Sequence, residues 1–202
     1  MILDKDSLKK KDVIKVAEEV LRGGADVIQY RDKTSSDKAF IKEAMALKEI
    51  IKRHGRTFII NDRIDAARAV GADGVHLGQE DMPIRYAREI IGNKIIGVSA
   101  HSLEEALRAE KDGADYIGIG PVFKSPSKPG LKPIGPAVLK NIKKSAGIPF
   151  FAIGGINLKN VADLKKMGIN KIAVISAAIA NGDICKSVSH LKHELENKSK
   201  AK

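Results

Sequence analysis

The sequence has one cysteine, no tryptophan and only 4% aromatic residues among its 202 residues. The lone Cys185 cannot form a disulfide within the chain, and no cysteine or histidine lies beside it at metal-ligand spacing. No apolar run approaches the roughly 18 residues that a membrane span needs, and residues 1–5 lack the apolar core of a secretory signal. These absences exclude a disulfide scaffold and predict a cytoplasmic protein with no membrane partner.

The charge is strongly of one sign, with a net value of +11. Such a balance is compatible with a non-catalytic protein that binds nucleic acid. However, the lysines are scattered over expected helix faces, with clusters at residues 9–11 and after Lys186, and no nucleic-acid module is present. We therefore expect solvated helix faces and small anionic substrates, and no nucleic acid.

The length and the 43% hydrophobic content suffice for one sizeable core, so we expect a single domain over residues 1–202, with a basic helix end and tail at 185–202. Eight short β-rich runs alternate with stretches of helical periodicity. The runs are residues 2–3, 27–30, 58–60, 75–77, 95–98, 116–119, 150–153 and 172–175. Repeated strand and helix units require a parallel sheet, and eight of them predict a compact α/β fold, the (β/α)8 TIM barrel, with a short first strand. An open doubly wound sheet is the alternative, but no Gly-x-Gly-x-x-Gly follows the first run.

Similar turns close four of the expected helices, at residues 23–26, 71–73, 113–115 and 167–170. Each contains glycine, which suits the left-handed residue at a helix C-terminus, so four similar joints are expected. Helix starts are expected after residues 35–37, at Ser102 with Glu105 three residues on, and after Asn157.

In a parallel barrel, the residues just beyond the strand C-termini meet at one mouth. After the second run, Gln29, Arg31 and Lys33 share one face of the strand and point into the mouth if Tyr30 points outward. Two cations and an amide favour a polyanion next to a heterocycle or carbonyl. The alternative for Arg31 is an ion pair with an acid on the neighbouring strand.

A pair of carboxylates follows two consecutive strands. Asp62 comes after Asn61 at the end of the third run, and Asp81 follows the fourth. Two carboxylates with waters and phosphate oxygens suit magnesium. The alternative for Asp62 is a helix cap, and we expect His76, in the middle of the fourth run, to be a core residue and not a ligand.

Three further groups lie beyond later strands. Ser99 could donate to a substrate oxygen, whereas His101 is expected to cap a helix. The long loop at residues 120–130 has the length of a mobile flap that carries Lys128, or it is merely a long surface loop. Glycines at 154–155 and the stretch at 176–178 predict a phosphate cradle of backbone amides.

Seven motifs in this order resemble one family, from about Val13 to Asn181. They are Gln-Tyr-Arg-Asp-Lys (29–33), Ile-Asn-Asp-Arg (60–63), Val-His-Leu-Gly-Gln-Glu-Asp (75–81), Gly-Val-Ser-Ala-His (97–101), Ile-Gly-Ile-Gly-Pro-Val-Phe (117–123), Ala-Ile-Gly-Gly-Ile (152–156) and Ile-Ser-Ala (175–177). Together they are similar to the thiamine phosphate synthase family, TIM-barrel transferases that join hydroxymethylpyrimidine diphosphate to hydroxyethylthiazole phosphate and release pyrophosphate.

The resemblance implies a role for each matching residue. Asp62 and Asp81 would bind Mg²⁺, and Arg31, Lys33, Lys128 and Ser99 would act in catalysis. Contacts with the pyrimidine diphosphate would come from Gln29, Tyr30, Arg31, Asp32, Lys33, Asn61, Ser99 and Lys128. Contacts with the thiazole phosphate would come from Ser125, Pro126, Ser127, Gly155, Ile175 and Ser176. The resemblance also implies a dissociative mechanism in which diphosphate leaves before the thiazole nitrogen attacks.

Two departures from the family pattern are Ser125-Pro126-Ser127, where two threonines around a variable residue are common, and the short first strand. The nearest competing family is the thiazole tautomerase, a related barrel without diphosphate or magnesium. Asp81 and Lys128 favour the synthase, since a tautomerase has no use for either. No oligomeric state follows from the sequence.

Overall fold

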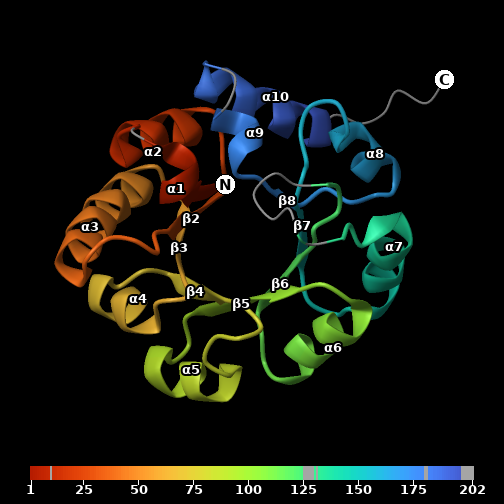
Figure 1. Ribbon diagram of the computed structural model, residues 1–202, viewed down its shortest axis with the longest axis horizontal. Coiled ribbons are helices and arrows are strands. Elements are labelled where there is room, and N and C mark those ends of the chain that lie inside the picture. Colours follow the sequence, from red (N-terminus) through yellow and green to blue (C-terminus); the bar gives the residue numbers. More distant parts are fainter. Residues whose placement is uncertain (10, 125–129, 131, 180–181, 197–202) are drawn as a thin grey trace.

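The computed structural model describes residues 1–9, 11–124, 130, 132–179 and 182–196. Eight parallel strands form one sheet in sequence order, β1 to β8, and helices surround it (Figure 1). A backbone hydrogen bond from the Ile2 amide to the Val174 carbonyl, at 3.0 Å, joins the end of the sheet to its beginning. The predicted (β/α)8 barrel is therefore confirmed.

All eight predicted runs contain a strand. The strands are β1 (Ile2–Asp4), β2 (Val27–Arg31), β3 (Thr57–Asn61), β4 (Gly74–Leu77), β5 (Ile95–Ala100), β6 (Tyr116–Ile119), β7 (Phe150–Ile153) and β8 (Ile172–Ala173). The first strand is short, as expected, with three residues. The eighth is shorter than its apolar run, since it has two.

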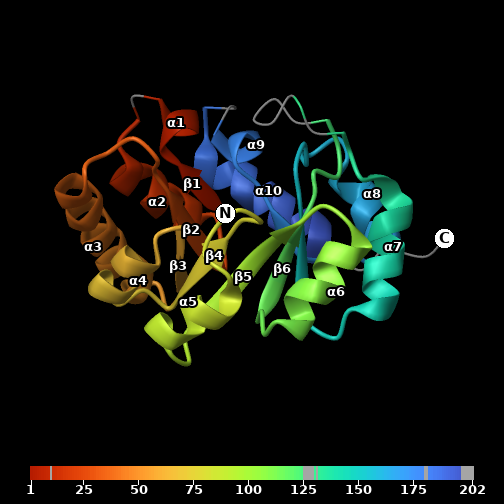
Figure 2. The ribbon, with the colours of Figure 1, turned by 60° about the horizontal axis from the view of Figure 1, so that its bottom comes forward.

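The helices are α1 (Lys5–Leu8), α2 (Val13–Arg22), α3 (Asp37–Arg53), α4 (Ile64–Val70), α5 (Ile84–Ile91), α6 (Leu103–Lys111), α7 (Gly135–Ser145), α8 (Val161–Lys166), α9 (Ser176–Ile179) and α10 (Ile184–Glu196). Figure 2 shows α1 and α9, which directly follow β1 and β8, at the same end of the barrel. This end is the mouth where the strand C-termini meet. Among the described residues, no helix is both long enough and apolar enough to cross a bilayer.

Alternation along the strands separates the helix side from the barrel interior. On β2, Ile28 and Tyr30 are fully buried toward the helices, and the Tyr30 ring packs on Phe40 of α3 with 4.9 Å between centroids. Gln29 lies between them and therefore points into the barrel. Tyr30 points outward, so the condition on which the inward direction of this face depended is met, and Gln29 and Arg31 share the inward face.

The four glycine joints are built alike. Gly24, Gly71, Gly113 and Gly168 all have positive φ, from 69° to 97°. At each joint, the next residue donates its amide to a carbonyl five residues back, as from Ala72 to Ala67 and from Ala114 to Ala109. This bond satisfies a carbonyl that the helix end leaves without a partner. The predicted repeat of one joint is confirmed.

Two of the three expected helix starts are confirmed. Ser36 and Ser102 accept hydrogen bonds from the amides of Ala39 and Glu105. The Glu105 carboxylate in turn accepts from the His101 amide at 2.7 Å. The expectation for Asn157 was wrong, because residues 157–160 form a separate turn and α8 begins only at Val161.

Candidate active site

The mouth of the barrel holds a backbone outlier at Asp62, directly after β3. Its φ is +61°, and the Arg63 amide donates to the Asn61 carbonyl at 2.7 Å across it, which makes a γ-turn. A non-glycine residue in this region is strained and persists only where the surroundings hold it. Here the Asp62 amide donates to the His76 carbonyl of β4 at 2.8 Å, which anchors the turn.

The carboxylates of Asp62 and Asp81 face each other. Burial raises the pKa of Asp62, and the neighbouring Asp81 carboxyl raises it further, while Lys33 opposes both effects. The Lys33 ammonium lies 3.1 Å from an Asp62 oxygen. Asp81 is itself fixed, because one of its oxygens accepts from the Gly78 amide at 2.6 Å. Two carboxylates that repel each other in a half-buried site favour the binding of a cation between them.

The helix-cap alternative for Asp62 is not what the structure contains. The cap residue of α4 is Arg63, and no side chain caps this helix. The Asp62 side chain instead serves Lys33 and the pair with Asp81. Within the described part of the chain, no group of three or more His, Cys, Asp or Glu could hold a metal ion. Two carboxylates are nevertheless the set with which Mg²⁺ is held when substrate phosphates and water complete its shell.

Arg31 forms an ion pair with an acid on the neighbouring strand, which was the alternative expected for this residue. Its guanidinium donates to Asp4, the last residue of β1, at 2.5 Å, and Asp4 and Arg31 are partners in the β1–β2 register. Asp4 is only 6% exposed, and its other oxygen accepts from Ser7 at 2.5 Å. The pair lies at the mouth and holds the Arg31 side chain in one place. It leaves part of the guanidinium's five donors for an anion.

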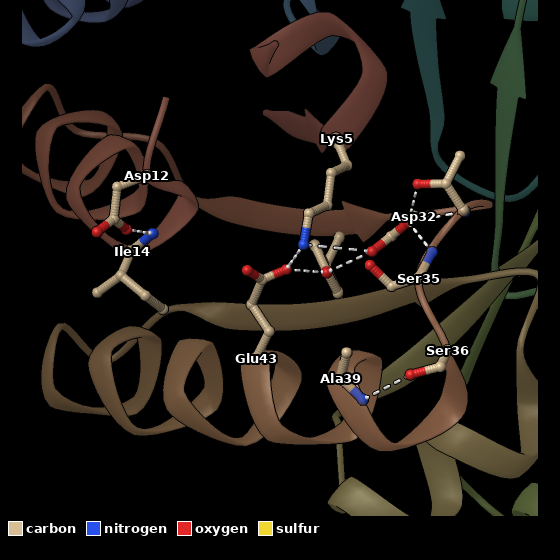
Figure 3. A network of polar contacts seen from close by, with 10 residues as sticks. Lys5, Asp12, Ile14, Asp32, Ser35, Ser36, Ala39 and Glu43 are labelled. Carbon is tan, nitrogen blue, oxygen red and sulfur yellow. Dashed lines mark hydrogen bonds and ion pairs between the residues drawn. The ribbon is translucent and has the colours of Figure 1, made fainter. Parts of the chain in front are cut away.

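Asp32 and Tyr30 belong to a polar network behind the β2 strand end. Asp32 accepts from the Thr34 and Ser35 amides at 2.9 and 3.0 Å, and Figure 3 shows Lys5 between its carboxylate and that of Glu43. The Tyr30 hydroxyl donates to Glu43 and lies 3.2 Å from Asp32. Although burial opposes its ionisation, the hydrogen bonds from Ser35 and Thr34 lower the pKa of Asp32. This network shapes the loop that carries Lys33, and it lies on the helix side of β2.

Ser99, near the end of β5, lies in a chain of polar side chains inside the barrel. Its hydroxyl is 2.9 Å from His76 Nε2, and His76 Nδ1 is 2.9 Å from the Tyr116 hydroxyl. His76 is 8% exposed, so the expectation of a satisfied core histidine is confirmed. His101 instead bonds through Nδ1 to the Gly120 carbonyl and links the ends of β5 and β6.

The expected phosphate cradle follows β7 and β8. Gly154 and Gly155 have φ of +96° and +65°, and a Cβ at Gly155 would lie 2.5 Å from the Lys124 carbonyl oxygen. The Gly155 carbonyl accepts from the side-chain amides of Asn157 and Asn160. Ile175 is half-buried and Ser176 is exposed at the start of α9. Glycine is required here by both conformation and space.

The predicted site residues Ser125, Pro126, Ser127 and Lys128 lie outside the described residues. The others come together at the mouth, except that Tyr30 and Asp32 lie in its wall. Two residues were missed from the sequence, Asp4 and Tyr116. The register of β1 against β2 would have revealed Asp4, whereas Tyr116 starts its strand and carries no signal of its own.

Comparison with known proteins identifies the family of the chain. Residues 1–178 match the family described as thiamine monophosphate synthase. The thiamine-phosphate synthase of Chloroflexus aurantiacus is 49% identical over 178 residues, which cover 88% of this chain and 82% of that protein. That of Clostridium tetani is 44% identical over 192 residues, with 95% and 92% covered.

A solved structure gives the same result. The thiamine phosphate pyrophosphorylase of Pyrococcus furiosus superposes with a TM-score of 0.89 at 42% identity, and the match covers 96% of this chain and 94% of that one. Identity at this level over nearly the whole length shows that the chain belongs to the thiamine monophosphate synthase family.

Proposed function

We propose that the chain is a thiamine-phosphate synthase, a transferase that joins a pyrimidine to a thiazole. In the reaction, the bond between the pyrimidine methylene carbon and the diphosphate oxygen breaks. The thiazole nitrogen then forms a bond to that carbon, which gives thiamine phosphate and free pyrophosphate. The observation that carries the proposal is the facing pair Asp62 and Asp81 with Lys33 at 3.1 Å, at the ends of two adjacent strands.

The diphosphate belongs on the β2–β4 side of the mouth. Arg31 is held by Asp4 and Lys33 by Asp62, so both cations are positioned before substrate arrives. Asn61 immediately precedes the turn, and Lys128 would add a further charge from outside the described residues. Preorganised donors of this kind contribute on the order of 3 kcal/mol each to a transition state in which charge develops.

Magnesium is the cofactor that this donor set fits best. Asp62 and Asp81 would hold it, since their mutual repulsion is relieved by a divalent cation and hard oxygen ligands suit it. When bound, the ion neutralises charge that develops on the leaving diphosphate. Lys33 contacts Asp62, so its ammonium lies beside the carboxylates that would hold the ion and within reach of the diphosphate.

The pyrimidine ring belongs between Gln29 and Ser99, whose side chains face the interior from β2 and β5. Tyr30 and Asp32 act from behind the strand by shaping the Lys33 loop. The thiazole phosphate belongs opposite, at Gly155, Ile175 and Ser176, with Ser125, Pro126 and Ser127 as its further expected contacts. The two substrates thus approach the same centre from opposite sides of the mouth.

No protein nucleophile is needed for this reaction. The side chains named above withdraw and hold the diphosphate, and the second substrate supplies the nucleophilic nitrogen. A tautomerase has no diphosphate to release, so the carboxylate pair favours the transferase over that alternative. We also propose that the partners are small molecules in the cytoplasm and that no nucleic acid is bound. This proposal is supported by the basic residues of the site, which are held in fixed positions at the mouth of the barrel.

The direct test measures pyrophosphate release by the purified protein with both phosphorylated substrates and Mg²⁺. Release should require both substrates and should stop on addition of a chelator. Asp62→Asn and Asp81→Asn should each lose turnover by a factor of at least about 100. The matched control is Asp65→Asn, because Asp65 is exposed on α4 and its carboxylate pairs with Arg63. Turnover that survives in either aspartate variant, or a wild-type protein indifferent to chelator, would overturn the assignment.

A further inference from the structure

A line of four polar side chains runs through the barrel interior, and nothing so far assigns two of its members a part in the reaction. The line runs from Gln29 on β2 through Tyr116 on β6 and His76 on β4 to Ser99 on β5. Its two ends are the residues proposed to contact the pyrimidine. Of its middle members, His76 is buried, and Tyr116 is half-buried at the start of β6, at the end of the strand away from the mouth.

The fold makes room for the two rings with glycine. A Cβ at Gly97 would lie 2.0 Å from Tyr116 Cζ, and a Cβ at Gly118 would lie 3.1 Å from His76 Cε1. Glycine inside a strand weakens it and marks a place where another group approaches closely. The Tyr116 ring also packs edge-on against Phe151, with 5.4 Å between centroids. The rings are therefore held in fixed positions inside the barrel.

The direction of the hydrogen bonds follows from the number of protons. The Tyr116 hydroxyl has one hydrogen, and its oxygen receives a hydrogen bond from the Gln29 side chain. Burial raises the pKa of the Tyr116 hydroxyl above its usual range, so the hydroxyl keeps its hydrogen at neutral pH, although the Gln29 bond acts in the opposite direction. That hydrogen is available to His76 Nδ1, 2.9 Å away.

A neutral imidazole has one donor and one acceptor nitrogen. If Nδ1 accepts from Tyr116, then Nε2 carries the hydrogen and donates to the Ser99 hydroxyl oxygen, also at 2.9 Å. Ser99 then has its own hydrogen left to donate. Ser99 lies near the end of β5, so this hydrogen can reach a ligand at the mouth, and the ring nitrogen of a heteroaromatic ligand accepts such a bond.

We propose that Tyr116 and His76 are positioning residues for the pyrimidine substrate, which orient Ser99 as a hydrogen-bond donor and fix the amide of Gln29 through a one-way chain of hydrogen bonds. The inference rests on the proposed function for the identity of the ring. It adds that recognition of that ring depends on the tautomer of His76, a residue inside the barrel that acts on the substrate only through Ser99.

The test has a structural reading that needs no substrate. Nitrogen-15 NMR of histidine-labelled protein reports which ring nitrogen of His76 carries the hydrogen, and the signal is assigned by its loss in His76→Asn. We expect Nε2–H in the wild type and a mixture of tautomers in Tyr116→Phe. A wild-type His76 with its hydrogen on Nδ1 would reverse the chain and refute the proposal, whatever the activity.

The kinetic reading uses the same variants. Tyr116→Phe should lower kcat/KM for the pyrimidine diphosphate by about five- to tenfold, the effect of one hydrogen bond, and leave the KM for thiazole phosphate unchanged. Tyr86→Phe is the control, because Tyr86 is exposed on α5. An equal loss toward both substrates would indicate a merely structural role and contradict the proposal.

Two substitutions of His76 separate positioning from folding. In His76→Gln, the amide nitrogen can occupy the place of Nε2 and donate to Ser99, whereas in His76→Asn the shorter amide reaches only the Tyr116 side. The glutamine variant should therefore retain more pyrimidine affinity than the asparagine variant at similar thermal stability. The reverse order would refute the chain. A wild-type protein without transferase activity would refute the proposed function instead, and the NMR result would still stand on its own.

Discussion

The strained backbone at Asp62 gives a prediction that separates conformation from charge. Asp62→Gly and Asp62→Ala both remove the carboxylate, so both abolish the repulsion with Asp81, the contact with Lys33 and the metal site. They differ in the backbone. Glycine adopts a φ of +61° freely, while alanine must be strained to do so. The difference in stability between the two variants therefore measures the strain at this one residue.

The expected difference is about 1 kcal/mol in favour of glycine. A left-handed residue costs an L-amino acid with a Cβ about 1–2 kcal/mol, and the larger entropy that glycine loses on folding offsets about 0.5–1 kcal/mol of that. For a chain of this size, 1 kcal/mol corresponds to a Tm difference of about 2–4 °C. Thermal unfolding followed by circular dichroism, in the presence of chelator, measures it.

The same pair of variants ties the strain to function. Both should be inactive, because neither can hold the cation, so the more stable variant gains nothing in turnover. If Asp62→Ala were more stable than Asp62→Gly by about 0.5–1 kcal/mol, the entropy of glycine alone would account for the difference, and the residue would not be strained. If either variant turned over substrate, the carboxylate would be dispensable.

Three further outcomes are expected. Near pH 7 and without metal, Asp62→Asn should melt at a higher temperature than the wild type. The folded pKa of Asp62 is raised by burial and by Asp81. The protonated carboxyl therefore contributes its full stability below the unfolded pKa of 3.8, and this contribution is lost as the pH rises through the folded pKa. The advantage should vanish below about pH 4, and a constant difference would contradict it. Asp4→Ala should cost about 1–3 kcal/mol in urea unfolding and raise the KM for the diphosphate, because it strands Arg31, whereas Asp6→Ala, exposed on α1, should do neither. Gly155→Ala should raise the KM for thiazole phosphate and lower the free energy of unfolding by more than about 1 kcal/mol, since its Cβ would meet Lys124 and Phe123. Gly113→Ala is the control. Gly113 also has a positive φ but has open space around it, so this variant measures the cost of the backbone conformation alone.

The fold could be predicted because the repeated strand and helix units have local sequence patterns. Parallel strands covered on both faces read as short apolar runs, and each helix end repeats the same glycine turn. Strand ends were less predictable. Residues 172–175 are as apolar as other runs, yet β8 ends at Ala173, and the carbonyl of Val174 bonds to Ile2 of β1, far away in the sequence.

The candidate site was predictable only in part, for the same reason. Asp62 and Asp81 follow adjacent strands, so their meeting at the mouth follows from topology alone. The pairing of Asp4 with Arg31 depends on the register of β1 with β2, which no local pattern fixes. The role of Tyr116 depends on the missing side chain at Gly97, its partner in the β5–β6 register, and no local pattern fixes that register.

The seam of the barrel, where two-residue β8 meets three-residue β1, lies between the two proposed binding regions. Arg31 and Asp4 lie on one side of this seam, and Ser176 lies on the other side. When both regions are occupied, the two substrates would hold together the β8 and β1 strands, which are the shortest in the barrel. The complex with both substrates should therefore exchange its amide hydrogens at β1 and β8 more slowly than the complex with either substrate alone.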